Sequence, residues 1–220
     1  MDGLTSGVGC DWVLVTGQPG SGKTTAVLSL VRALQERIRE HSVEQLKAGL
    51  RLQGFVTEEV MKGGTRIGFD VVTIPDGRRG VLSRKGGRAS LPKTGQYSVD
   101  VDSFERLALP TLCPEDDAST ASSTVYVVDE IGRMELHSDK FKLSIQRLLA
   151  EGVRLVGAIT APIYGHRVAF CDAVSNTKGV EVHKLTKKVR DAVVASLTRD
   201  LTQRWAENPH TGTKRRRVGQ

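Results

Sequence analysis

The sequence predicts an α/β domain with a mostly parallel sheet, and three observations lead to that class. Residues 12–16 form a short apolar run of the kind found in strands that are buried on both faces. A glycine-rich segment and a helical pattern over residues 23–40 follow this run directly. Two further apolar runs, at residues 125–128 and 155–160, indicate more buried strands. Buried strands separated by helices form three-layer folds, with helices on both faces of the sheet.

The chain between the first helix and residue 101 predicts an antiparallel excursion from that sheet. Residues 41–51 are polar and predict a connector with a helical extension. A short strand is expected at residues 97–101. Between these lie three strand-like pieces. Residues 54–57 open the first, which is followed by a turn at 62–64; the second spans 67–74 and ends at a turn at 75–77, and the third is short, at 80–82.

The rest of the chain predicts the helices that complete the layers. Asp102 or Ser103 is expected to cap a helix that runs towards Leu109. Asp139 begins another helix, and Thr186 is expected to cap the last one. The remaining expected elements are a polar low-complexity loop at residues 115–124 and a strand at residues 180–182.

Length and composition favour one soluble domain. The chain has 220 residues, of which 39% are hydrophobic and 26% charged, which is enough to bury a core without disulfides or a structural metal. We expect the domain at residues 12–205, with an N-terminal extension at 1–11 and a basic, disordered tail at 206–220. Three widely spaced cysteines favour a reducing, intracellular and cytoplasmic location. No apolar run approaches the ~20 residues of a membrane helix, so no membrane partner is expected.

The net charge of +7 is unevenly distributed. Four positive charges, Lys214–Arg217, lie together in the tail, so the folded domain is only mildly basic and is not expected to bind nucleic acid. The run predicts a nuclear-import signal, a nonspecific polyanion-binding arm or a disordered solubilising end. Residues 77–99 contain six basic and no acidic residues. That stretch predicts either a mobile cationic loop that closes over phosphates or a solvated surface loop.

Residues 17–24 match the phosphate-loop (Walker A) pattern G-x-x-x-x-G-K-[ST] at every fixed position. Glycines let successive backbone N–H groups curve around a phosphate, and the helix N-terminus and the Lys23 ammonium add positive charge. The Thr24 hydroxyl is placed to bind a Mg²⁺ ion that bridges the outer phosphates. The segment therefore predicts a nucleotide-binding loop, formed by Gly17, Gln18, Pro19, Gly20, Ser21, Gly22, Lys23 and Thr24.

An acid pair, Asp129 and Glu130, ends the apolar run at 125–128 and supplies the second half of the predicted site (Walker B). In phosphate-loop enzymes an acid at the end of a core strand holds Mg²⁺, which is the position of Asp129. Glu130 is placed to deprotonate a water molecule aimed at the γ-phosphate. A surface acid pair at a strand end is the alternative, and the phosphate loop upstream argues against it.

Five segments, in order along the chain, resemble the cancer-related nucleoside-triphosphatase family of small P-loop proteins: GQPGSGKTT at 17–25, GFVTEEV at 54–60, RIGFDVVT at 66–73, GQYSVDV at 95–101 and VDEIGRME at 128–135. The resemblance spans about residues 12–201. It implies a RecA-like domain that hydrolyses nucleoside triphosphates slowly and with broad base specificity. It also implies that Gly17–Thr24 bind phosphates, that Asp129 binds Mg²⁺ and that Glu130 is the catalytic acidic residue. A second nucleotide-contacting segment would fall at about Val127–Met134.

Other candidate residues keep two interpretations each. Arg133 could offset charge on the transferring phosphoryl group, or form a salt bridge with Glu135 or Glu59. Glu58 and Glu59 could reach the site or face solvent. Cys171 is expected to be a small core residue rather than a reactive thiol.

The leading hypothesis is a Mg²⁺-dependent nucleoside-triphosphatase acting on ATP, GTP and other nucleoside triphosphates. Lys23 and Glu130 would be its catalytic residues, and Thr24 and Asp129 its metal ligands. A small nucleotide or metabolite kinase is the main alternative, with residues 77–99 as its lid. A nucleotide-operated switch is the third class. No guanine signature N-K-x-D and no adenine reader is present, so the sequence does not predict the base.

Overall fold

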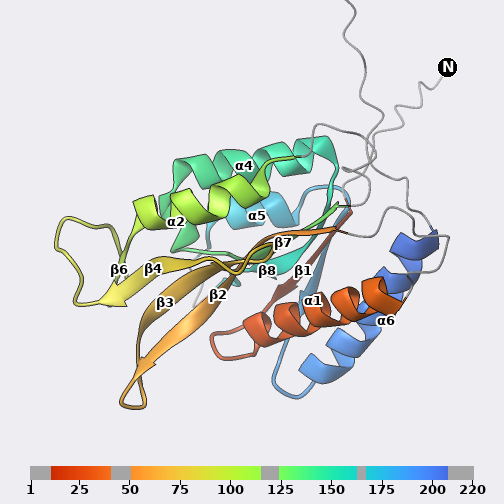
Figure 1. Ribbon diagram of the computed structural model, residues 1–220, viewed down its shortest axis with the longest axis horizontal. Helices are drawn as coiled ribbons and strands as arrows, with labels where there is room; N and C mark the ends of the chain where they lie inside the picture. The colour runs from red at the N-terminus through yellow and green to blue at the C-terminus, as the bar shows by residue number, and fades with distance from the viewer. Residues whose placement is uncertain (1–10, 41–50, 115–123, 163–166, 208–220) are drawn as a thin grey trace, which may run out of the picture.

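The computed structural model describes residues 11–40, 51–114, 124–162 and 167–207, and these form a sheet with helices on both faces (Figure 1). The nine strands found there lie in the order β5-β6-β4-β3-β2-β7-β8-β1-β9. Nearly all of four expected segments lies outside the described residues: the extension at 1–11, the connector at 41–51, the loop at 115–124 and the basic tail at 206–220.

The half of the sheet that carries the phosphate loop is parallel. Along the sheet, β2 pairs with β7, β7 with β8, β8 with β1, and β1 with β9. All of β8 is buried, as are the four central residues of β1, because helices cover both faces. One strand, β8, therefore separates the phosphate-loop strand β1 from the acid-bearing strand β7. The strands are β1 (Asp11–Thr16), β2 (Arg51–Lys62), β7 (Thr124–Ile131), β8 (Arg154–Ile159) and β9 (Val180–Lys184).

The antiparallel excursion exists and is larger than predicted. Strands β2, β3, β4, β6 and β5 pair antiparallel in that order, and β2, which is twelve residues long, begins three residues before the expected start at Gly54. The expectation of a mobile or solvated loop over the whole of residues 77–99 was wrong, because β4, β5 and β6 all lie within it, and only residues 86–92 form a loop between β4 and β5. Arg84 and Arg79, which suggested a loop, instead pair with Asp70 of the neighbouring strand. The strands are β3 (Thr65–Thr73), β4 (Arg79–Lys85), β5 (Lys93–Thr94) and β6 (Tyr97–Val99).

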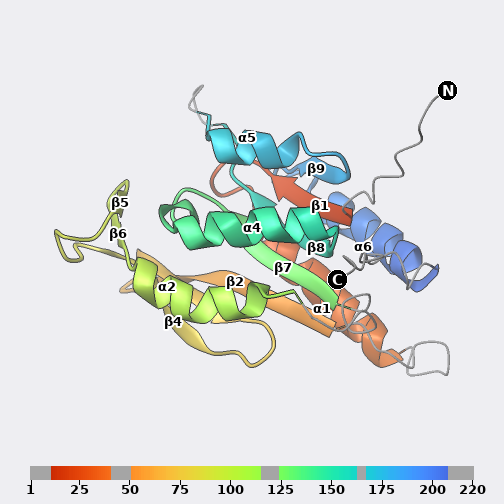
Figure 2. The ribbon, with the colours of Figure 1, turned by 90° about the horizontal axis from the view of Figure 1, so that it is seen from above.

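Helices α1 (Lys23–Glu40) and α6 (Arg190–Glu207) cover one face of the sheet. Helices α2 (Val101–Ala108), α4 (Asp139–Glu151) and α5 (Ala169–Ser175) cover the other (Figures 1 and 2). Two short 3₁₀ segments, η2 (Leu109–Leu112) and η3 (Glu135–His137), follow α2 and β7. Each face has its own apolar core, so the three-layer α/β fold is confirmed. Among the described helices, none is both long and apolar enough to cross a bilayer.

Helix starts were predicted to within a few residues. The cap of α2 is Asp100, whose carboxylate accepts the Ser103 N–H at 2.9 Å, so the expectation of Asp102 or Ser103 was wrong. Asp139 does begin α4, capped by the preceding serine. Helix α6 begins at Arg190, and its N–H donates to the Thr186 carbonyl at 3.0 Å across the preceding turn.

Helix α6 is fastened to the phosphate-loop strand at its far end. The Asp11 carboxylate accepts the indole N–H of Trp205 at 2.6 Å and a guanidinium N–H of Arg204 at 3.0 Å. Trp205 is fully buried, together with Leu197 and Leu201, in the core that α6 shares with α1. These contacts hold α1 and α6 as one layer against β1.

Candidate functional site

The phosphate loop is a tight turn between β1 and α1 whose glycines are required by its shape. Gly20 and Gly22 have φ values of 75° and 90°, which only glycine adopts readily. A Cβ on Gly17 would lie 2.6 Å from the Leu185 carbonyl oxygen and 2.6 Å from the Ser21 hydroxyl. Ser21 is 6% exposed, and its Oγ has no hydrogen-bond partner among the described residues. The loop therefore has the backbone of an anion nest, with a buried hydroxyl beside it.

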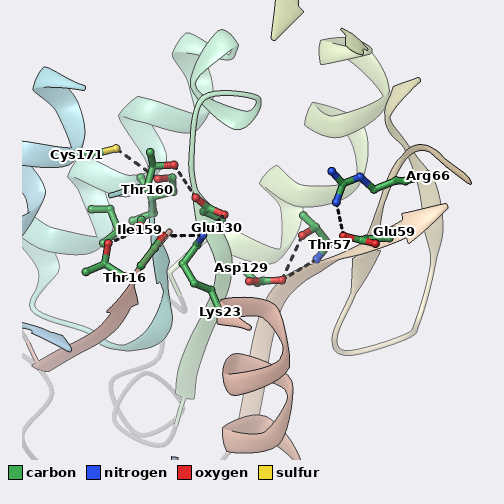
Figure 3. Close-up of polar contacts among 12 residues, drawn as sticks. Thr16, Lys23, Thr57, Glu59, Arg66, Asp129, Glu130, Ile159, Thr160 and Cys171 are labelled. Atoms are coloured by element: carbon green, nitrogen blue, oxygen red, sulfur yellow. Dashed lines mark hydrogen bonds and ion pairs between the residues drawn. The ribbon is translucent and has the colours of Figure 1, made fainter. Parts of the chain in front are cut away.

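Lys23 and Glu130 meet at the carboxyl edge of the parallel sheet (Figure 3). Lys23 Nζ lies 3.7 Å from Glu130 Oε2 and donates to the Gly17 carbonyl at 3.3 Å. The Thr160 hydroxyl donates to Glu130 Oε1 at 2.6 Å. Thr160 directly follows β8, the strand between β1 and β7, so the sheet order explains how these three side chains converge. One carboxylate oxygen is thus held by a hydroxyl, and the other faces the loop lysine.

Asp129 lies in a separate, fully buried position beside β2. Its Oδ2 accepts both the backbone N–H and the hydroxyl of Thr57, at 3.3 and 3.2 Å. Burial raises the pKa of Asp129 to about 7, with a further rise from the Glu130 charge, and the hydroxyls of Thr57 and Thr24 partly oppose it. Asp129 Oδ1 makes no hydrogen bond within the described residues. A buried carboxylate oxygen with an unused lone pair, next to the Thr24 hydroxyl, fits a hard cation such as Mg²⁺.

A third carboxyl group, Glu135 of η3, lies against the same site. Burial raises the pKa of Glu135 to about 8, with smaller contributions from the charges of Glu130 and Asp129. A Cβ on Gly132 would come within 2.9 Å of Glu135 Oε2 and 3.1 Å of Glu130 Cγ, which shows how closely the two glutamates approach. Burial thus raises the pKa values of two carboxyl groups, Asp129 and Glu135, that lie beside Glu130.

Cys171 is buried on α5 next to this cluster. Its thiol donates to the Ile131 carbonyl at 3.4 Å, and burial raises the pKa of the thiol to about 12. A thiol with such a high pKa is a poor nucleophile near neutral pH. The prediction that Cys171 is a core residue is confirmed.

The structure brings Lys23, Thr24, Asp129 and Glu130 together, as the sequence predicted, and places Glu58 and Glu59 elsewhere. Glu59 pairs with Arg66 at 2.6 Å on the exposed part of β2, and Glu58 pairs with Arg79. Both glutamates belong to surface ion pairs. Arg133 is exposed in the turn after Glu130, and its backbone carbonyl lies 3.5 Å from the Thr94 hydroxyl.

Three site residues were missed by sequence reasoning: Thr57, Thr160 and Glu135. Thr160 had a usable signal, because a polar residue directly after a buried parallel strand lies at the functional edge of the sheet. Thr57 gave no such signal, since its contact depends on β2 lying beside β7. Glu135 was considered only as a salt-bridge partner for Arg133, whereas its carboxyl group is buried beside Glu130 and the residue is 5% exposed.

Comparison with known proteins shows to which family the chain belongs. The profile of a family described as NTPase matches residues 12–198, which is most of the chain. The chain belongs to this NTPase family. The relationship agrees with the resemblance found in the sequence motifs.

Individual members of the NTPase family align over nearly their whole lengths. The human cancer-related nucleoside-triphosphatase is 39% identical over 191 residues, which cover 84% of this chain and 93% of the relative. The nucleoside-triphosphatase THEP1 of Thermotoga petrophila is 32% identical over 203 residues, or 91% of this chain and 98% of the relative. The solution structure of a human cancer-related nucleoside triphosphatase matches with a TM-score of 0.68 at 38% identity, covering 88% of this chain and 98% of that one. The crystal structure of THEP1 from Aquifex aeolicus also matches with a TM-score of 0.68. Its sequence is 29% identical, and the match covers 84% of this chain and 96% of that one.

Proposed function

We propose that this protein is a Mg²⁺-dependent nucleoside-triphosphatase that hydrolyses ATP, GTP and other nucleoside triphosphates to the diphosphate and phosphate, without strong base preference. One observation carries the proposal: the carboxylate of Glu130 lies 3.7 Å from the phosphate-loop ammonium of Lys23 and is oriented by Thr160. A carboxylate at that place lies beside the end of a bound triphosphate and can accept a proton from water. The names of the NTPase relatives support the same reaction class.

Each residue has a role that follows from its contacts. Backbone N–H groups of the phosphate loop bind the phosphates, and Lys23 exchanges its contact with Glu130 for one with the outer phosphates. Glu130 then takes a proton from the attacking water, while Thr160 keeps the carboxylate oriented. Thr24 and Asp129 are the residues that would hold Mg²⁺, which supplies positive charge to the phosphate oxygens when bound. Thr57 fixes the Asp129 carboxylate so that Oδ1 remains available.

The decisive experiment measures phosphate release from ATP and GTP by the wild-type protein and by Glu130→Gln. The glutamine keeps the shape of the side chain but cannot accept the proton, so turnover should fall by ~10²-fold or more. Glu59→Gln is the matched control, because it removes an acid from an exposed ion pair on β2 and should leave turnover unchanged. Equal turnover in the wild type and Glu130→Gln would refute the assigned role of Glu130.

The position of β4 argues against the lid that a kinase was expected to need. The basic stretch that was to act as a lid contains β4, which is hydrogen-bonded into the sheet between β3 and β6. Adding a nucleoside monophosphate to the same assay separates the two activities. Hydrolysis predicts that phosphate appears in solution at an unchanged rate, whereas a kinase would transfer it to the monophosphate.

A further inference from the structure

The order of the strands sets the direction in which a bound nucleotide must lie. The acids that define the γ-phosphate end, Asp129 and Glu130, belong to β7, on one side of β1. On the other side of β1 lies β9, followed in the chain by α6. Because the phosphate chain is roughly linear, its nucleoside end must leave the loop away from β7. That direction leads towards the segment joining β9 to α6.

This segment, residues 185–190, is in direct contact with the phosphate loop. The Leu185 N–H donates to the Thr16 carbonyl at 2.6 Å, at the end of β1. The side chain of Arg190 lies over Gly22, since a Cβ placed there would be 2.7 Å from Arg190 Cδ and 3.0 Å from Nη1. Thus the loop is flanked by the acids on one side and by Arg190 on the other.

Arg190 is held in place and still accessible. It is the first residue of α6, whose packing against α1 and attachment to Asp11 fix the position of the helix. The side chain is 32% exposed, and its Nε donates to the exposed Asp191 at 2.8 Å. A planar cation with a fixed backbone and an accessible face is suited to stacking against an aromatic ring.

We propose that Arg190 forms a base platform, in which its guanidinium stacks on the nucleobase of a nucleotide whose phosphates occupy the loop. The proposal rests on the proposed function in placing the phosphates at residues 17–24. Stacking uses the π-face that every base has, so this contact tolerates purines and pyrimidines alike. The platform explains how a chain without a base-reading motif gains affinity from the nucleoside.

The test compares ligands that have a base with one that lacks it. Equilibrium dissociation constants for ADP, GDP and CDP, and for inorganic tripolyphosphate, are measured with the wild type, Arg190→Ala and Arg190→Lys. Arg190→Ala should weaken all three nucleotides by about 10-fold and tripolyphosphate clearly less, because tripolyphosphate loses only the positive charge beside the loop whereas the nucleotides also lose the stacking contact. Arg190→Lys should show the same loss, since an ammonium keeps the charge but not the plane. If the Arg190→Ala variant does not fold, the Arg190→Lys variant alone decides between stacking and its absence.

Arg199→Ala is the matched control, because it removes an exposed arginine of the same helix two and a half turns away, and it should change none of the constants. Several results would overturn the platform: unchanged nucleotide binding in Arg190→Ala, a parallel loss of tripolyphosphate binding, full affinity in Arg190→Lys, or a loss confined to one base. The dissociation constants are measured without any hydrolysis of the ligands. A wild type that binds nucleotides but releases no phosphate would therefore refute the proposed function and leave the platform to be decided by the binding constants.

Discussion

The buried carboxyl group of Glu135 should make the ligand-free protein less stable as the pH rises. Its pKa is raised from 4.5 to about 8, chiefly by burial. Below pH 4.5 the group is protonated in both the folded and the unfolded chain. Between pH 4.5 and 8 the unfolded chain loses this proton and the folded chain keeps it, so the free energy of unfolding falls by about 1.4 kcal/mol per pH unit. Above pH 8 the loss is complete and levels off.

The substitution Glu135→Gln removes this penalty, because the amide is neutral at every pH and similar in shape. The window of 3.5 pH units between the two pKa values corresponds to a gain of up to about 5 kcal/mol for the variant above pH 8. The gain should vanish near pH 4. This figure is an upper limit. Part of the raised pKa comes from the charges of Glu130 and Asp129, and their side chains can move away from a charged Glu135 in the wild type, which lowers the penalty that the variant removes. Against a typical unfolding free energy of roughly 5–15 kcal/mol, the effect is large.

Urea unfolding of the ligand-free wild type and Glu135→Gln at pH 4.5, 6, 7 and 8.5 measures the difference directly. Glu59→Gln serves as the control, because this exposed acid should give no gain that grows with pH. If Glu135→Gln were no more stable than the wild type at pH 8.5, the conclusion that Glu135 is held neutral by burial would be refuted.

Three further substitutions test the contacts around the site and the core. Thr57→Val removes the hydroxyl bond to Asp129, so the Mg²⁺ concentration for half-maximal activity should rise several-fold, as shown by a metal titration. Thr160→Val frees the Glu130 carboxylate, and kcat should fall about 10-fold with little change in KM; equal kcat values would contradict this role. Trp205→Ala opens a cavity between α6 and α1 and should lower the free energy of unfolding by about 3–5 kcal/mol in a denaturant titration.

The parts of the site that could be predicted from the sequence are those coded by neighbouring residues. The phosphate loop has a fixed spacing, and the pair Asp129–Glu130 directly follows an apolar run, so both were identified without a structure. Thr57 could not be found in this way, because its bond to Asp129 joins residues 72 positions apart. Its role depends on β2 pairing with β7, which no local pattern encodes.

The error over residues 77–99 has a similar origin. A stretch with six positive charges and no negative ones is typical of a loop when it is considered alone. In the folded chain the compensating acids come from other strands: Asp70 on β3 accepts from Arg84 at 2.6 Å and from Arg79 at 3.2 Å. Leu82 points the other way, into the core, so β4 has one polar and one apolar face. The charge composition correctly predicted the polar face of β4, which carries Arg79 and Arg84, and missed its apolar face, which carries Leu82.

The clustering of Asp129, Glu130 and Glu135 is costly for a ligand-free protein and suited to a site that receives a cation and a polyphosphate. Of the three, Glu130 faces the Lys23 ammonium. The other two, Asp129 and Glu135, are buried, and burial raises their pKa values to about 7 and about 8. A metal ion at Asp129 would favour its ionised form, so binding should release a proton and strengthen as the pH rises through about 7. A ligand that binds only the folded state would also raise the free energy of unfolding by RT ln(1 + [L]/Kd). Apolar side chains at these positions would give a more stable core, but such a core would lack the coupling between proton release, metal binding and stability that we expect from the three carboxyl groups.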